Sequence, residues 1–94
     1  MEIEVTEVIV RKIPKEGKVK AICSIILNNA FAVHDVKVIE NLQGKLIVAM
    51  PNRKVEANEG NFKWKDVAHP TRPDIRQAIE RAVMKALKEY EENM

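Results

Sequence analysis

The sequence predicts a single α+β domain spanning residues 1–94, in which an antiparallel β-meander of four to five strands precedes one long C-terminal helix. Three observations predict it. Short apolar runs fill the first half of the chain, turn-forming residues separate these runs, and an amphipathic period follows near the C-terminus. The composition, 46% hydrophobic and 32% charged, is that of a folded globular domain.

The apolar residues of the first predicted strand, residues 2–13, change parity halfway along the strand. We therefore expect a β-bulge near Thr6 and Glu7, which would bring these side chains to one face. Turn residues end this strand and separate the strands after it. We expect those strands at residues 18–28, 31–40 and 45–51, then a polar loop at residues 52–61 and a fifth short strand at residues 62–68.

The predicted helix begins after Thr71, which has the spacing of a capping box with Asp74. Pro73 falls in the first turn, where its missing N–H costs nothing. Beyond it, apolar residues recur at alternating steps of three and one for about five turns, which indicates an amphipathic helix. These residues are Ile75, Ala78, Ile79, Ala82, Val83, Ala86, Leu87 and Tyr90.

One helix covers only one face of a sheet, yet apolar side chains are predicted on the second face as well. Leaving each of them in water forgoes roughly 1.5–3 kcal/mol. A second copy of the chain is the simplest cover, so we expect a two-fold symmetric homodimer formed through the sheet. The alternative is a meander curled tightly enough to bury both faces by itself. The predicted interface residues are Ile22, Ile26, Val36 and Val38.

The cellular compartment follows from weaker features. The single cysteine, Cys23, cannot form an intrachain disulfide, which suits a reducing cytoplasm. The acidic N-terminal stretch has no signal-peptide pattern, and no apolar run approaches the ~20 residues of a membrane span. We therefore expect a cytoplasmic protein without a membrane partner.

Catalytic and metal-binding residues are scarce. His34–Asp35 and the pair Asp66 and His69 could in principle hold a divalent ion. The two pairs lie thirty residues apart, however, and no third nitrogen or sulfur ligand is near them. Structural roles are favoured instead: a hydrogen-bonded interior or interface residue for His34, and an anchor of the strand-to-helix corner for His69. We predict no enzyme activity, no metal and no cofactor.

The basic residues indicate a different kind of site. On a helical wheel Arg81, Lys85 and Lys88 form a stripe away from the apolar face. Arg72 and Arg76 lie at the helix N-terminus, where unpaired backbone N–H groups favour anions. Further basic residues precede the helix and would suit a phosphate backbone. A solvated face with Arg76–Glu80 and Lys85–Glu89 pairs explains the helix equally well. The basic residues before the helix are Arg53, Lys54, Lys63 and Lys65.

Five stretches occur in a characteristic order: IEVTEVIVRK, EGKVKAICSI, FAVHDVKVIE, LIVAMPNRK, and DVAHP just before the predicted helix. Together they resemble the SpoVG family (stage V sporulation protein G, the bacterial septation regulator). The resemblance runs from Ile3 to Lys85 and covers nearly the whole chain. It implies a small cytoplasmic α+β dimer linked to control of division septation and, in spore formers, to sporulation.

The resemblance also implies a nucleic-acid-binding regulator that uses the region around the C-terminal helix. On that pattern the expected DNA or RNA contacts are Arg53, Lys54, Arg72 and Arg76, joined by Arg81 and Lys85 of the helix stripe. The family's signature positions are matched by His34, Asp35, His69 and Pro70, which we interpret as architectural.

The chain departs from the family pattern in a longer loop that carries Glu56, Glu59 and Trp64. Trp64 could stack on a base or pack under the helix, and packing is favoured. The short acidic tail casts doubt on any contact made by a longer family tail. A second hypothesis is a protein-interaction module that recruits a division-machinery partner through the sheet edge or through residues 52–61.

Overall fold

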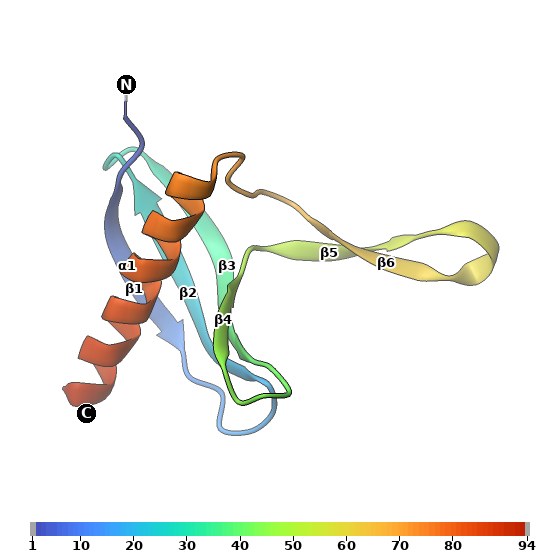
Figure 1. The fold of residues 1–94 in the computed structure, drawn as a ribbon, viewed down its shortest axis with the longest axis horizontal. Coiled ribbons are helices and arrows are strands. Elements are labelled where there is room, and N and C mark those ends of the chain that lie inside the picture. Colours follow the sequence, from blue (N-terminus) through green and yellow to red (C-terminus); the bar gives the residue numbers. More distant parts are fainter. Residues whose placement is uncertain (1, 94) are drawn as a thin grey trace.

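The computed structural model describes residues 2–93 and shows one four-stranded sheet, one two-stranded hairpin and a long helix (Figure 1). Strands β1 (Val5–Lys12), β2 (Val19–Leu27), β3 (Phe31–Glu40) and β4 (Leu46–Ala49) form an antiparallel meander in sequence order. Strands β5 (Asn52–Glu56) and β6 (Phe62–Asp66) form the hairpin, with a 3-10 turn, Asn58–Gly60, near its tip. Helix α1 spans Pro73–Glu92. The predicted α+β class, the four-stranded meander and the single long helix are confirmed.

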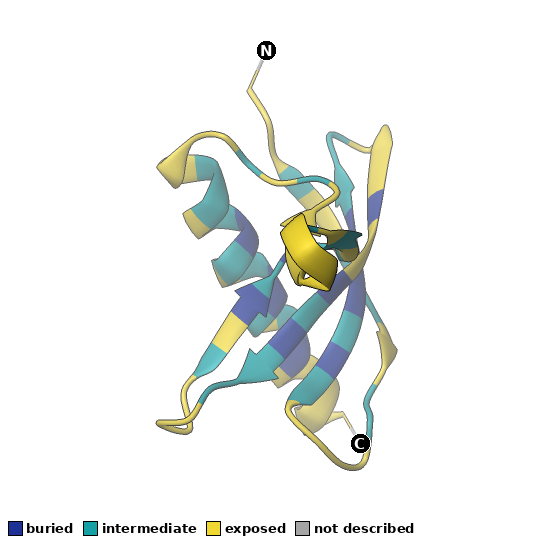
Figure 2. Ribbon diagram, turned by 90° about the vertical axis from the view of Figure 1, so that its right-hand side faces the viewer, coloured by how far each residue is buried: buried dark blue, intermediate teal, exposed yellow. Residues whose placement is uncertain are grey.

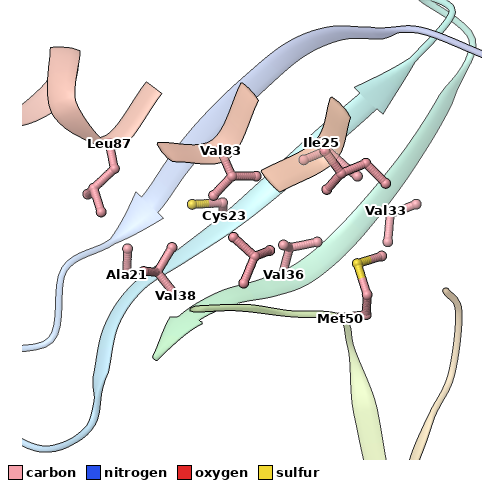
Figure 3. Packing of buried hydrophobic residues seen from close by; sticks show 11 residues of the cluster. Ala21, Cys23, Ile25, Val33, Val36, Val38, Met50, Val83 and Leu87 are labelled. Carbon is pink, nitrogen blue, oxygen red and sulfur yellow. The ribbon is translucent and has the colours of Figure 1, made fainter. Parts of the chain in front are cut away.

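Helix α1 lies across one face of the four-stranded sheet, and the core fills the space between them (Figures 1 and 2). The central strand β2 contributes Ala21, Cys23 and Ile25, none of which is exposed. The helix contributes the predicted apolar stripe, in which Ile79, Val83 and Leu87 are the buried members. Figure 3 shows Val83 and Leu87 of the helix facing the side chains of β2 between helix and sheet. Because the core is aliphatic, its contribution to stability comes from close packing and the removal of apolar surface from water.

A β-bulge in β3 changes which side chains reach this core. Cys23 pairs with Val36 and Ile25 pairs with Val33, so Ser24 alone faces two residues of β3. The extra residue is Asp35, whose φ of 62° lies in the left-handed region. The bulge reverses the alternation, so Val36 and Val38 face the helix and are fully buried. The prediction that these two valines lie on the second face is wrong.

The second face of the sheet, which the helix does not cover, is apolar nevertheless. Ile22 and Ile26 alternate with the core residues of β2 and are half-buried there, as predicted. Strand pairing places three further isoleucines on the same side. We call the set the outer-face isoleucines: Ile9, Ile22, Ile26, Ile39 and Ile47. The two-sided apolar sheet is therefore present with partly different members, and the homodimer stays a prediction.

The bulge in β1 and the turn between β2 and β3 are both found where the sequence predicts them. A register shift between Val5 and Glu7 is the bulge predicted in β1, and it lets Val5, Val8 and Val10 pack against the core. The β2–β3 turn contains two consecutive asparagines with positive φ, a conformation that asparagine tolerates better than most residues.

The segment after β4 differs from the prediction of a polar loop. Residues 52–56 are a strand that pairs along its length with residues 62–66. The resulting ribbon, which we call the arm (residues 52–66), projects away from the four-stranded sheet and from α1 (Figure 1). Trp64 is 70% exposed on this arm, so the expectation that it packs under the helix is wrong. The fifth strand predicted at residues 62–68 is present but ends at Asp66, and it pairs with β5 in a separate sheet.

The start of α1 differs from the predicted capping box. Arg72 is the N-cap residue, its side chain makes no cap hydrogen bond, and Pro73 is the first helical residue. Thr71 therefore lies one position too early to cap the helix. Among the helices of residues 2–93, none combines the length and hydropathy that spanning a membrane requires.

Candidate functional site

The arm has two chemically different faces, because directly opposed residues of a hairpin point to the same side. Arg53 pairs with Lys65, and Val55 pairs with Lys63. These four residues form one side, which we call the basic face, and its three cations are exposed. Its register brings no acidic residue onto this side.

The basic face is not explained by the stability of the arm. Like charges directly opposite each other, as Arg53 and Lys65 are, destabilise a strand pair. A two-stranded hairpin is also only marginally stable by itself in water. An anion bound on this face would offset the repulsion and order the arm.

The opposite side, which we call the aromatic face, consists of three opposed pairs: Asn52 with Asp66, Lys54 with Trp64, and Glu56 with Phe62. Its two rings are largely in water, with Phe62 59% and Trp64 70% exposed. Lys54 Nζ lies 4.2 Å from the centre of the Phe62 ring, a cation–π contact that is worth ~0.5–1 kcal/mol at an exposed site.

Two of the predicted contact residues, Arg53 and Lys54, therefore lie on the arm but on different faces. Lys63 and Lys65 were noted only as basic neighbours in the sequence, and they complete the basic face. The alternation of aromatic and basic residues in FKWKD was the signal that could have found them. It becomes informative only when residues 52–56 are known to be the partner strand.

The other predicted contact residues lie on α1 and are not equivalent to one another. Arg81 and Lys85 are exposed and Arg76 is half-buried. Arg72 Nε donates to Asp74 Oδ1 at 3.0 Å, and Arg72 Nη2 donates to Asp74 Oδ2, so the charge of Arg72 is already compensated. The hydrogen bonds and charge of Arg72 lower the pKa of the exposed Asp74 carboxyl, and Asp74 raises the pKa of Arg72.

The basic residues do not form one continuous patch. Helix α1 lies across one face of the sheet, whereas the arm projects away from both. The helix stripe and the basic face are therefore separate surfaces (Figure 1). The ion pairs within residues 2–93 are Lys20–Glu40 and Arg72–Asp74. The alternative Arg76–Glu80 and Lys85–Glu89 pairs are therefore not formed in the described part of the chain, and Arg76 and Lys85 make no ion pair there.

His34 belongs to a hydrogen-bonded chain on the outer face of the sheet. Arg11 Nε donates to Ser24 Oγ at 3.1 Å, and Ser24 Oγ lies 2.8 Å from His34 Nδ1. A serine beside a histidine can be a nucleophile with its base, but Ser24 is only 1% exposed and also accepts from Arg11. The chain therefore satisfies a buried hydroxyl. This agrees with a structural role for His34, while Asp35 forms the bulge beside it.

His69 and Pro70 lie at the corner between the arm and the helix. His69 Nδ1 donates to the carbonyl oxygen of Pro70 at 3.1 Å. Both residues line an apolar hollow of about 230 Å³ under the start of α1, together with Ile75 and Ile79. Within residues 2–93 no group of three or more histidine, cysteine or acidic side chains is arranged to hold a metal ion. The Asp66–His69 and His34–Asp35 pairs, which the sequence analysis weighed as possible metal ligands, are not combined into such a group in this part of the chain.

The fold and the arm together define a small α+β domain that presents a charged and aromatic β-ribbon beside its core. The SpoVG family model matches residues 3–92, and the chain belongs to the SpoVG family. This is a non-enzymatic family of septation and regulatory proteins. The resemblance stated from the sequence motifs is therefore confirmed.

Curated relatives agree with the family match. A protein of Clostridioides difficile (strain 630) is 51% identical over 87 residues, which cover 93% of this chain and 89% of that protein. A protein of Thermoanaerobacter sp. (strain X514) is 49% identical over 89 residues, covering 95% and 88%. One from Clostridium novyi (strain NT) is 47% identical over 89 residues, covering 95% and 81%. Each carries the name "Putative septation protein SpoVG".

Proposed function

We propose that this protein is a nucleic-acid-binding regulator linked to control of cell-division septation, and to sporulation where the host sporulates. The link to septation rests on the family and on the names of its relatives. The binding of DNA or RNA rests on one observation above all. The arm presents Arg53, Lys63 and Lys65 in register on one exposed face.

A phosphate backbone is the ligand that best suits this face. Lysine and arginine neutralise phosphates and release condensed counterions, so affinity falls with salt. Three phosphate contacts give a slope of roughly −2.7 in log K against log salt on duplex DNA, since each contact contributes about −0.9. Arg81 and Lys85 on α1 form a second cationic surface, whereas the internal pair with Asp74 makes Arg72 the weakest of the predicted contacts.

The experiment is a salt-titrated comparison of duplex DNA, single-stranded DNA and RNA with the purified protein. The double variant Lys63→Ala/Lys65→Ala is expected to bind more weakly and to lower the magnitude of the salt slope by about 2. Lys15→Ala/Lys18→Ala removes the same charge from the exposed β1–β2 turn and is the matched control. Equal affinity and equal slope for the two double variants would show that the arm is not the site.

The helix stripe is tested separately with Arg81→Ala/Lys85→Ala. If α1 contacts the same phosphate backbone, this variant lowers the magnitude of the slope by a similar amount, and its effect adds to that of the arm variant because the two surfaces share no residue. An unchanged slope would restrict the interface to the arm.

We also propose that the protein is a homodimer that covers the outer-face isoleucines. The half-buried apolar side chains of this face support it. Two-fold symmetry would present the basic face twice on one particle.

A protein-interaction module acting on the division machinery is the alternative function. It is favoured by the exposed apolar side chains of the arm region, among them Phe62, Trp64 and Val67. Capture of a defined division protein that survives high salt and nuclease treatment, and that is lost in Trp64→Ala, would support this alternative over nucleic-acid binding.

A further inference from the structure

We propose that the aromatic face of the arm is a base-stacking platform and that the nucleic acid it binds is single-stranded. This inference rests on the proposed nucleic-acid binding and names the ligand class of the same arm. Phe62 and Trp64 supply the rings, Lys54 supplies a cation on the same face, and the basic face supplies the phosphate contacts.

The two rings have no role in the packing of the fold. They are 59% and 70% exposed and lie outside the core cluster beneath α1. Aromatic side chains have some of the largest apolar surfaces in proteins, and leaving both in water forgoes their burial. A ligand that covers flat apolar surfaces would recover it.

The spacing of the rings favours an unstacked strand. Phe62 and Trp64 are two residues apart in β6, which corresponds to about 6.6 Å along an extended chain. Successive nucleotides in one strand of a duplex rise by only ~3.4 Å, and each base is covered by its neighbours. Two bases can occupy the two rings only if they are splayed apart, as they are in a single strand.

The charges of the arm favour a polyanion over an apolar partner. Lys63 and Lys65 flank Trp64 in the sequence and point to the other side of a ribbon that is only one sheet thick. Their long side chains can reach a backbone that follows the edge of β6. Lys54, directly opposite Trp64, adds a fourth cation, and its ammonium group already lies over the Phe62 ring.

Two acidic residues limit where the phosphates can lie. Glu56 and Asp66 stand at the two ends of the aromatic face, opposite Phe62 and Asn52. They repel phosphates from the ends of this face, so the phosphates of a strand stacked on the two rings lie nearer Lys54 and Trp64. The arm therefore combines stacking rings with an adjacent cationic edge, which is how single strands are bound with little sequence preference.

Trp64 is the only tryptophan in the chain, so intrinsic fluorescence reports on the arm alone. Titration with an oligothymidylate is expected to quench this emission saturably, whereas a duplex of the same length quenches it much less. Labelled oligothymidylate followed by anisotropy gives the affinity of variants that lack the tryptophan. Trp64→Ala and Phe62→Ala should each weaken binding about 5- to 150-fold, the equivalent of the ~1–3 kcal/mol of one base–aromatic stack.

The controls separate stacking from folding and from charge. Trp64→Phe keeps a ring and should retain most of the affinity. Phe31→Ala removes a ring that is 65% exposed on the body of the protein and should leave the affinity unchanged. Thermal melts of all variants establish that the body is folded.

The outcomes distinguish this inference from the proposed function. If Lys63→Ala/Lys65→Ala weakens binding but Trp64→Ala and Phe62→Ala do not, the phosphate interface stands and the stacking platform is wrong. Equal quenching by duplex and single strand also overturns the inference. Loss of a dimer in Trp64→Ala with unchanged affinity for the oligonucleotide assigns the aromatic face to a second copy. Absence of binding to any nucleic acid overturns both proposals.

Discussion

At the scale of single residues, Asp35 determines which side chains of β3 reach the core. Its φ of 62° lets two residues of β3 face one residue of β2, and the valines that follow turn toward the helix. For most L-residues the left-handed conformation costs about 1–2 kcal/mol, and aspartate is one of the residues that adopt it most often. The bulge also places His34 beside Ser24, so one backbone conformation organises both faces of the strand.

We therefore expect Asp35→Val to destabilise the protein by about 1–2 kcal/mol relative to Asp35→Gly, because a β-branched residue resists a positive φ. Urea unfolding at fixed protein concentration measures the difference. Asp66→Val is the control, since Asp66 is an exposed strand residue without a positive φ, and it should change stability by about 0.5 kcal/mol or less. Equal stabilities of Asp35→Val and Asp35→Gly would mean that the bulge does not depend on this conformation.

The pair at the start of α1 gives a prediction about pH. Arg72 lowers the pKa of Asp74, so the ionised carboxylate stabilises the folded state. This stabilisation is fully present above the ordinary pKa of aspartate and is lost as the pH falls through the lower folded pKa. An NMR titration of the Asp74 carboxyl carbon should therefore give a midpoint below 3.8 in the wild type. In Arg72→Ala the midpoint should move back toward 3.8, and an unmoved midpoint would contradict the pairing.

At the scale of elements, helix α1 is held by one buried stripe rather than by caps. No side-chain cap hydrogen bond forms at its N-cap, while Ile79, Val83 and Leu87 are buried against the sheet. Most helical stability in proteins comes from such packing of an amphipathic face.

Leu87→Ala is expected to lower the free energy of unfolding by about 2–5 kcal/mol, because Leu87 is 3% exposed and its truncation leaves a cavity. Lys88→Ala changes the neighbouring exposed residue and should have an effect below about 0.5 kcal/mol. Calorimetry at one protein concentration checks both variants. Similar melting temperatures for Leu87→Ala and Lys88→Ala would show that the last turns of α1 do not contribute to the core.

The helix and the meander could be predicted because each buries one side against the core, which leaves a period in the sequence. The arm could not, because both of its faces are in water and NRKVE shows no apolar alternation. The predicted faces of Val36 and Val38 were wrong for another reason. Counting alternate residues assumes a regular strand, and nothing in the sequence VHDV distinguishes a bulged strand from a regular one. The sequence identified Arg53 and Lys54 as basic residues. That they lie on opposite faces of the arm follows only from the register of β5 with β6.

At the scale of the whole molecule, the distribution of surfaces indicates how the parts act together. The core lies between α1 and the sheet, the outer-face isoleucines lie on the other side of the sheet, and the arm extends beyond both (Figures 1 and 2). A second copy that covers the isoleucines would leave the arm free for another ligand. Two arms on one particle would then raise the affinity for a long nucleic acid by effective concentration, without any new contact.

Sedimentation equilibrium is expected to give a particle of twice 10.7 kDa, the mass of one chain. Ile22→Glu/Ile26→Glu puts charges where the two-fold interface would bury apolar groups, so this variant should sediment as a folded monomer. Leu42→Glu is the control, because Leu42 is 91% exposed in the β3–β4 turn and not in the sheet, and it should remain dimeric. The monomeric variant should also lose the avidity for long oligonucleotides while keeping the affinity of a single arm for short ones. A folded wild type of 10.7 kDa at micromolar concentration would instead contradict the homodimer.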